Sequence, residues 1–97
     1  FNDYMATGAM HAVLEAGLSI PDDIAFVGFD DIEVASAIDP KLTTVRQHCF
    51  ELGCEAAKML LDDLEGKTSA SKIKTIKPTL VIRDSCGGDS TGEEFYF

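Results

Sequence analysis

The chain has 97 residues, of which 45% are hydrophobic, with a mean hydropathy of +0.05; this suffices for one small globular domain but not for two independent ones. Seventeen Asp and Glu residues against eight Lys and Arg residues give a formal net charge of −9. That sign repels phosphate backbones and anionic lipids, so this chain alone is not expected to bind DNA or a membrane. The apolar runs are short and indicate neither a signal peptide nor a transmembrane helix, which makes the cytoplasm the expected compartment.

The chemistry-bearing side chains give no sign of an enzyme. Cys49, Cys54 and Cys86 lack a Cys-x-x-Cys pair and zinc-type spacing, so we expect reduced thiols and no metal site. No serine, cysteine or threonine has a visible base and orienting partner, which predicts no catalytic residue. His11 and His48 are isolated in the sequence and fit surface or interface positions better than catalytic ones.

A helix is predicted at the start of the chain. Asn2 or Asp3 suits its N-cap, and apolar residues then recur at helical spacing. Gly17 suits its end after about Ala16. In an α/β unit a strand precedes such a helix, so Phe1 is expected to be the last residue of a strand and the sequence to be a segment of a longer protein.

Two strands are predicted next. Residues 24–29 form a continuous apolar run, which is typical of a parallel strand covered on both faces. Asp30-Asp31 ends this strand, and residues 32–38 predict a short helix or an irregular segment before a turn at Asp39-Pro40. Residues 42–47 predict the second strand.

A second helix is predicted from about Phe50 to Glu65, with Gly66 after its last turn. Its apolar positions share one face, which we expect to lie against the sheet. These positions are Phe50, Ala57, Leu60, Leu61 and Leu64. The triplet at 66–68 ends this helix and lacks the earlier glycine of a phosphate-binding loop, so no nucleotide cofactor is indicated, and no other cofactor is expected.

The last part of the chain is less regular. Residues 73–83 predict two short extended stretches around Pro78, in an edge hairpin or ribbon and not in a central strand. Residues 88–97 are rich in Gly, Asp, Ser, Thr and Glu and are predicted to be a flexible tail. The predicted fold class is therefore α/β, with parallel strands and flanking helices in residues 1–87.

The Asp30-Asp31 pair is the first candidate for a binding site. Open α/β sheets bind ligands at the C-terminal ends of their strands, where carboxylates can bind sugar hydroxyls or a cation. The alternative is that one aspartate caps the following segment, with Glu33 completing a capping-box pattern. Asn2 presents the same choice between a ligand contact and a helix cap. The residues alone leave both choices open.

Several short motifs follow one another along the chain. They are NDYMATGA at 2–9, GLSIPDDI at 17–24, VGFDD at 27–31, LTTVRQ at 42–47, ELG at 51–53 and PTLVIRDS at 78–85. In this order and spacing they resemble the lactose-repressor and purine-repressor (LacI/GalR) family of transcriptional regulators, from residue 1 to about 87. The resemblance implies the C-terminal part of the effector-binding domain, a partial periplasmic-binding-protein-like (Rossmann-like) subdomain.

Members of this family close two α/β subdomains on a small ligand and read operator DNA with a separate N-terminal helix-turn-helix. The resemblance therefore implies that this chain senses a small-molecule effector, a sugar or a nucleobase-like compound. It also implies a homodimer that binds operator DNA only through an N-terminal domain outside this sequence, with no membrane partner.

The resemblance also implies individual site residues by motif position. Side chains of the family at Asn2 and Asp30 bond the effector, Gln47 makes a polar contact, and Cys49 and Leu52 form lateral walls. Family members often carry an aromatic residue at the position of Cys49 and a tyrosine at that of Phe29, so the effector stays open. The implied dimer contacts are Thr7, Met10, His11, Val34 and Ile38. Burial within one subunit is the alternative for these residues, above all for Met10.

Two other functions fit parts of the sequence. A periplasmic-type sugar-binding protein has the same fold, and an export signal upstream would distinguish it from a regulator. A receiver-like phosphoacceptor domain would use Asp30-Asp31 to hold Mg²⁺ and accept phosphate. That function needs a lysine at the end of a later strand, whereas the lysines at 72, 74 and 77 lie in the ribbon-like stretch.

Overall fold

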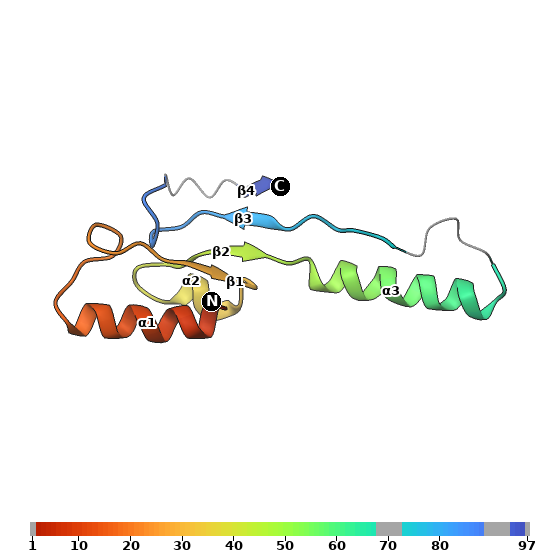
Figure 1. The fold of residues 1–97 in the computed structure, drawn as a ribbon, viewed down its shortest axis with the longest axis horizontal. Helices are drawn as coiled ribbons and strands as arrows, with labels where there is room; N and C mark the ends of the chain where they lie inside the picture. The colour runs from red at the N-terminus through yellow and green to blue at the C-terminus, as the bar shows by residue number, and fades with distance from the viewer. Residues whose placement is uncertain (1, 68–72, 89–93, 97) are drawn as a thin grey trace. The chain divides into compact units, whose positions relative to one another are not determined.

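The computed structural model describes residues 2–67, 73–88 and 94–96, and the chain forms two compact units. The chain up to Gln47 and from Pro78 onward belongs to the first unit, and residues 48–77 form the second. Figure 1 shows the path of the chain, which leaves the first unit after its second strand and returns to it at its third.

Helix α1 (Asp3–Glu15) begins and ends as the sequence predicts. The side chain of Asn2 is its N-cap and accepts a hydrogen bond of 2.9 Å from the backbone N–H of Met5. Gly17 follows the helix with a φ of +80°, a conformation that favours glycine, and the N–H groups of Gly17 and Leu18 turn back onto carbonyls of the last helical turn.

Four strands form one sheet in the order β1 (Val27–Phe29), β2 (Thr43–Arg46), β3 (Thr79–Val81) and β4 (Glu94–Tyr96). The pairing of β1 with β2 is parallel, as predicted, whereas β2 with β3 and β3 with β4 are antiparallel. Because β3 lies between two strands, the prediction of an edge ribbon around Pro78 is wrong. Part of the segment expected to be a flexible tail forms β4, and residues 89–93 and 97 lie outside the described residues, as does Phe1.

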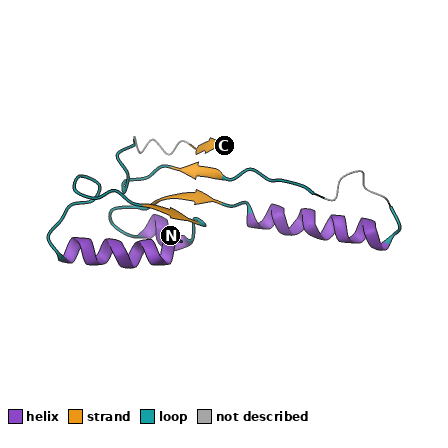
Figure 2. Ribbon diagram, viewed as in Figure 1, coloured by secondary structure: helices purple, strands orange, loops and turns teal. Residues whose placement is uncertain are grey.

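The short helix α2 (Glu33–Ala37), one of the two predicted alternatives for its segment, lies with α1 on one side of the strands (Figure 2). Their contacts form the small apolar core, which consists of Ala6, Met10, Ala35 and Leu42. Gly28 of β1 is buried, while its neighbours Val27 and Phe29 are 50% and 43% exposed. The strand is thus shorter than its apolar run and, in this chain, is not covered on both faces as predicted.

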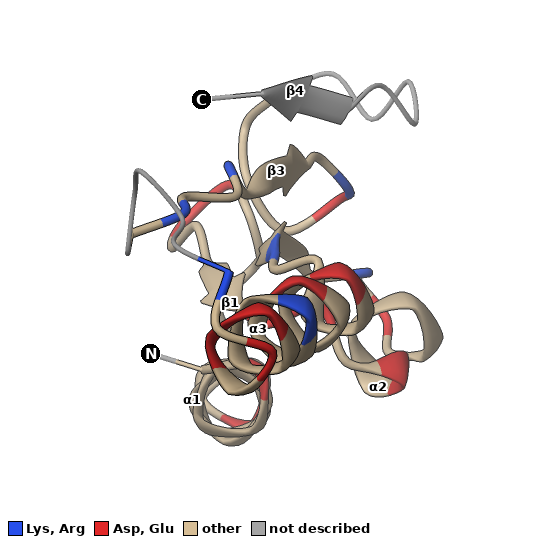
Figure 3. Cartoon of the chain, turned by 90° about the vertical axis from the view of Figure 1, so that its right-hand side faces the viewer, with Lys and Arg blue, Asp and Glu red and all other residues tan. Residues whose placement is uncertain are grey.

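The second unit contains helix α3 (Cys49–Leu64), which is followed by Gly66 with a φ of +73°. Acidic residues are spread along it (Figure 3), and the sequence identifies them as Glu51, Glu55, Asp62 and Asp63. No residue of α3 is buried, and Leu64 on its apolar face is 75% exposed. The helix is confirmed, and the apolar face that was expected to lie against the sheet is exposed in this unit. None of the described helices combines the length and hydropathy that crossing a bilayer requires.

Candidate functional site at the carboxyl ends of two parallel strands

Asp30 and Gln47 lie side by side at one edge of the sheet. Because β1 and β2 run parallel, the residues that follow them emerge at the same edge. The Nε2 group of Gln47 donates a hydrogen bond of 2.8 Å to Oδ1 of Asp30. The backbone N–H of Asp30 donates to the carbonyl of Val45 at 2.9 Å, which extends the parallel ladder by one bond. Both side chains belong to partly exposed residues. The fold therefore brings these two predicted site residues together.

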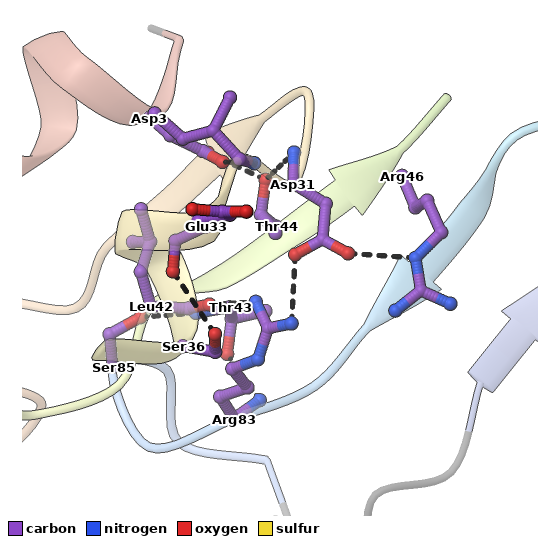
Figure 4. A network of polar contacts seen from close by, with 11 residues as sticks. Asp3, Asp31, Glu33, Ser36, Leu42, Thr43, Thr44, Arg46, Arg83 and Ser85 are labelled. Carbon is purple, nitrogen blue, oxygen red and sulfur yellow. Dashed lines mark hydrogen bonds and ion pairs between the residues drawn. The ribbon is translucent and has the colours of Figure 1, made fainter. Parts of the chain in front are cut away.

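Asp31 has a different environment from its neighbour in the sequence. Its Oδ2 accepts a hydrogen bond of 2.7 Å from Nε of Arg46, and its Oδ1 forms an ion pair of 2.8 Å with Nη2 of Arg83. Figure 4 shows the carboxylate between these two guanidinium groups, with its side chain only 8% exposed. Arg83 also donates to the carbonyl of Leu42 at 2.9 Å. Asp31 thus joins the end of β2 to the segment that follows β3.

The charge state of Asp31 follows from two opposing effects. Burial raises the pKa of this carboxyl, whereas hydrogen bonds and charges of Arg46 and Arg83 lower it. The combined effect of the two arginines is larger than that of burial, so the pKa lies below its ordinary value of 3.8. At neutral pH Asp31 is therefore ionised, and both of its oxygens are engaged by cations.

These contacts decide between the sequence alternatives for the aspartate pair. The N-cap of α2 is Ile32, which makes no side-chain cap bond, so neither Asp30 nor Asp31 caps that helix and the capping alternative is wrong. Since two arginines occupy the oxygens of Asp31, the pair does not offer the adjacent open carboxylates that a Mg²⁺-dependent phosphoacceptor needs. The receiver-like alternative is not favoured.

Asp3 is a structural residue that the sequence did not reveal. Its buried carboxylate accepts hydrogen bonds of 2.7 Å from the Thr44 hydroxyl and 2.9 Å from the N–H of Ile32. It approaches β1 so closely that a Cβ built on Gly28 would stand 2.1 Å from its Oδ1. An acidic residue in a first helical turn is ordinary, so Asp3 gave no signal by itself. The glycine within an apolar strand was the available sign of a close approach.

The remaining effector-site predictions fall on two different units. Asn2 is exposed and its side-chain oxygen is used as the α1 cap. Cys49 and Leu52 belong to the first turns of α3, in the second unit, and both are exposed. All three cysteines of the chain are free.

The predicted dimer residues divide by burial. Met10 is 3% exposed and belongs to the core, which favours the alternative of burial within the subunit for this residue. The hydroxyl of Thr7 donates to the carbonyl of Asp3 at 2.7 Å. His11 is exposed and lies 3.3 Å from Glu15. Val34 and Ile38 are partly exposed, and Ile38 also packs against the core.

Comparison with known proteins identifies the fold. Residues 1–86 match the family described as periplasmic binding protein-like domain. The HTH-type transcriptional repressor MelR of Bacillus subtilis is 44% identical over 86 residues, which is 89% of this chain and 25% of that protein. The chain spans about a quarter of the length of the curated relatives it matches.

Solved structures agree in the fold. A LacI family transcriptional regulator from Enterococcus faecium, with bound ribose, superposes with a TM-score of 0.78 at 38% identity, covering 89% of this chain and 32% of that one. The lac repressor dimer bound to operator and the anti-inducer ONPF gives a TM-score of 0.81 at 38% identity, covering 88% and 29%. The chain therefore belongs to the periplasmic binding protein-like domain family, as a part of the effector-binding domain of a LacI-type regulator.

Proposed function

We propose that this chain senses a small polar effector for a transcriptional repressor of the cytoplasm, and that Asp30 and Gln47 bind that effector. The observation that supports this most directly is their 2.8 Å hydrogen bond at the shared carboxyl edge of two parallel strands. Among the described residues, Oδ2 of Asp30 has no hydrogen-bond partner, so it remains available to accept one. The repressor MelR and the ribose-bound regulator support the same interpretation.

The chemistry of this edge favours a neutral ligand with hydrogen-bond donors, such as a sugar, over an anionic one. Asp30 is paired with a neutral amide, whereas the two nearby arginines are both engaged by Asp31. An uncompensated carboxylate repels phosphate groups but accepts hydrogen bonds from hydroxyls. A ligand with several hydroxyl donors and no negative charge suits this arrangement.

The test is the effector affinity of Asp30→Ala in the full-length protein that contains this chain. We expect binding to weaken by about 1.5–3 kcal/mol, the range for a hydrogen bond to a charged group, with little change in fold. Isothermal titration with ribose and a panel of neutral mono- and disaccharides measures this. Asp39→Ala, at an exposed aspartate, is the matched control and should bind like the parent. Equal affinities of the two variants would contradict the assignment.

A second substitution separates binding from folding. The φ of Asp30 is +111°, which is strained for a residue with a Cβ but open to glycine. Asp30→Gly should lose affinity as Asp30→Ala does, while its free energy of unfolding stays equal to or above that of the parent. A stability loss larger than that of Asp30→Ala would mean that the side chain serves the fold.

We also propose that the exposed residues of α1 and α2 form a homodimer contact, and that operator DNA is bound by another domain. Met10 is buried, but the other implied contact residues of α1 and α2 remain at least partly exposed. They are Thr7, His11, Val34 and Ile38. Val34→Asp should convert the dimer to monomers in size-exclusion chromatography with light scattering. Leu18→Asp, an equally drastic change at an exposed leucine outside these helices, should leave the dimer intact. The reverse pattern would place the contact elsewhere.

A further inference from the structure

Two side-chain pairs lie next to each other between the turn after β1 and the end of β2. Asp30 pairs with Gln47, and Asp31 pairs with Arg46. The partners are consecutive residues on both segments, yet one aspartate faces a neutral amide and the other a cation. The two carboxylates therefore differ in what they can offer a ligand, although they are adjacent in the sequence.

Asp31 is held from two separate elements. Arg46 belongs to β2 and Arg83 follows β3, and each contacts a different oxygen of the carboxylate. Moving this carboxylate away would take the anion from the guanidinium group of Arg83, whose side chain is mostly buried. Asp31 is thus anchored inside the unit, with each of its carboxylate oxygens already bonded to a guanidinium group.

The backbone between the two aspartates needs such an anchor. Asp30 and Asp31 have φ values of +111° and +54°, and consecutive positive values are rare for residues other than glycine. Unfavourable backbone conformations persist where the surroundings hold them. The N–H of Asp31 makes only a long contact of 3.4 Å to Oγ1 of Thr44, whereas its carboxylate makes two short ones. The side chain of Asp31 is therefore the stronger attachment of this turn.

We propose that Asp31 is a positioning residue of the effector site. Its pairs with Arg46 and Arg83 fix the turn that directs the carboxylate of Asp30 toward Gln47, and Asp31 itself does not contact the effector. The consequence for affinity rests on the proposed function, but the orientation of Gln47 is a property of the protein without ligand and can be measured directly.

The side-chain amide of Gln47 is the reporter. Gln47 is the single glutamine of the sequence, and its amide resonance in a ¹⁵N–¹H spectrum is assigned by its loss in Gln47→Ala. A hydrogen bond to a carboxylate shifts these protons downfield and slows their exchange. Asp30→Ala removes the acceptor and should move the signal to the position of a solvent-exposed glutamine. We expect Asp31→Asn, which keeps the size of the side chain and tolerates a positive φ, to move it there as well.

Variants of matched kind separate positioning from general stability. Arg46→Met removes one of the two ion pairs of Asp31, at a partly exposed residue. It should also move the Gln47 amide resonance to the position of a solvent-exposed glutamine. If Asp31→Asn does not fold, Arg46→Met alone tests whether Asp31 positions Asp30. Lys74→Met breaks an ion pair with Glu55 in the second unit, and Met10→Ala weakens the core without touching the turn. Both should leave the signal in place. An unchanged signal in Asp31→Asn, or in Arg46→Met, overturns the proposal.

Titration of ribose into full-length proteins that carry the same substitutions separates this inference from the proposed function. If Asp30→Ala binds ribose like the parent, the effector role of Asp30 fails, while the Gln47 signal still decides the role of Asp31. Where Asp30→Ala weakens binding, Asp31→Asn should weaken it by about five- to tenfold. In an Asp30→Ala background the same change should have less than about a twofold effect, because the carboxylate that Asp31 positions is gone. Equal effects in both backgrounds would assign Asp31 to stability alone.

Discussion

Asp31 in the first unit and Glu55 in the second are both carboxylates between two basic side chains, yet their surroundings differ. Two arginines approach Asp31 at 2.7 and 2.8 Å and are at least partly buried. Glu55 contacts Lys58 at 3.2 Å and also Lys74, and both lysines are mostly exposed. The hydrogen bond from Lys74, which lowers the pKa, is the largest cause at Glu55, whereas burial, which raises the pKa, is the largest single cause at Asp31. The same charge pattern therefore orders a turn in one unit, whereas in the other it joins a carboxylate to two mostly exposed lysines.

The apolar side chains of the two units differ in the same way. In the first unit small residues allow α1 to approach β1, and Met10 fills the core between the helices. In the second unit the leucines of α3 remain exposed, and the helix relies on local contacts such as the Glu55–Lys58 pair and the turn at Gly66. Tertiary packing stabilises the first unit, whereas the helix of the second has no buried residue through which packing could stabilise it.

Substituting glycines should give the largest contrast between the units. In Gly28→Ala the new Cβ meets Oδ1 of Asp3 at 2.1 Å and Cδ2 of Leu42 at 2.9 Å, so the protein should lose about 3 kcal/mol of unfolding free energy or more. In Gly53→Ala on α3 nothing lies within 4 Å of the new Cβ, and the variant should gain about 0.5–1 kcal/mol. Urea denaturation followed by circular dichroism measures both. Equal changes of the unfolding free energy in the two variants would mean that the Asp3 side chain can move away from the new Cβ without cost.

Truncating one apolar residue in each unit tests the difference in packing. Met10→Ala should cost about 2–3 kcal/mol, near the low end for core methionines because this core is small. Leu64→Ala should change the unfolding free energy by less than about 0.5 kcal/mol, because its side chain is already exposed. Thermal denaturation of the two variants beside the parent checks this. A loss at Leu64 as large as that at Met10 would show that the α3 face is covered in solution.

Acid should weaken the first unit through Asp31. Its pKa is lower in the folded protein than its ordinary value of 3.8, so its ion pairs stabilise the fold above about pH 4. This stabilisation is lost as the pH falls from that value through the lower pKa of the folded state. Asp31→Asn should therefore be less stable than the parent at pH 7, with the gap narrowing below pH 4. Urea titrations at several pH values measure the gap, and a constant gap would contradict this origin.

Local features of the fold were predictable from the sequence because they depend on neighbouring residues. The cap at Asn2 and the glycines after both long helices set the helix ends, and the apolar run before Asp30 placed a parallel strand. The exposure of α3 was not predictable in this way. A hydrophobic pattern shows which face favours burial, but not whether the chain supplies a surface to cover it.

The candidate site was predicted only in part. The position of Asp30 at a strand end, together with the family motif, indicated a binding residue, and its bond to Gln47 depends on the parallel register. The sequence did not predict that Asp30 and Asp31 have different environments. Which carboxylate is buried depends on the backbone turn and on Arg83, which is distant in the sequence. The approach of Asp3 to Gly28 joins elements that are distant in the sequence.

The first unit is assembled from two stretches of chain, and this has a consequence for the order in which it forms. The hydroxyl of Ser85 accepts a hydrogen bond from the N–H of Thr43 and donates one to the carbonyl of Phe26, 59 residues away in the sequence. During synthesis the residues of β1 and β2 are therefore made before Ser85, which links the two segments by hydrogen bonds. Loop-closure entropy rises slowly with length, by about 0.6 kcal/mol for each doubling. A longer segment between Gln47 and Pro78 would thus cost the first unit little stability, but would delay its completion.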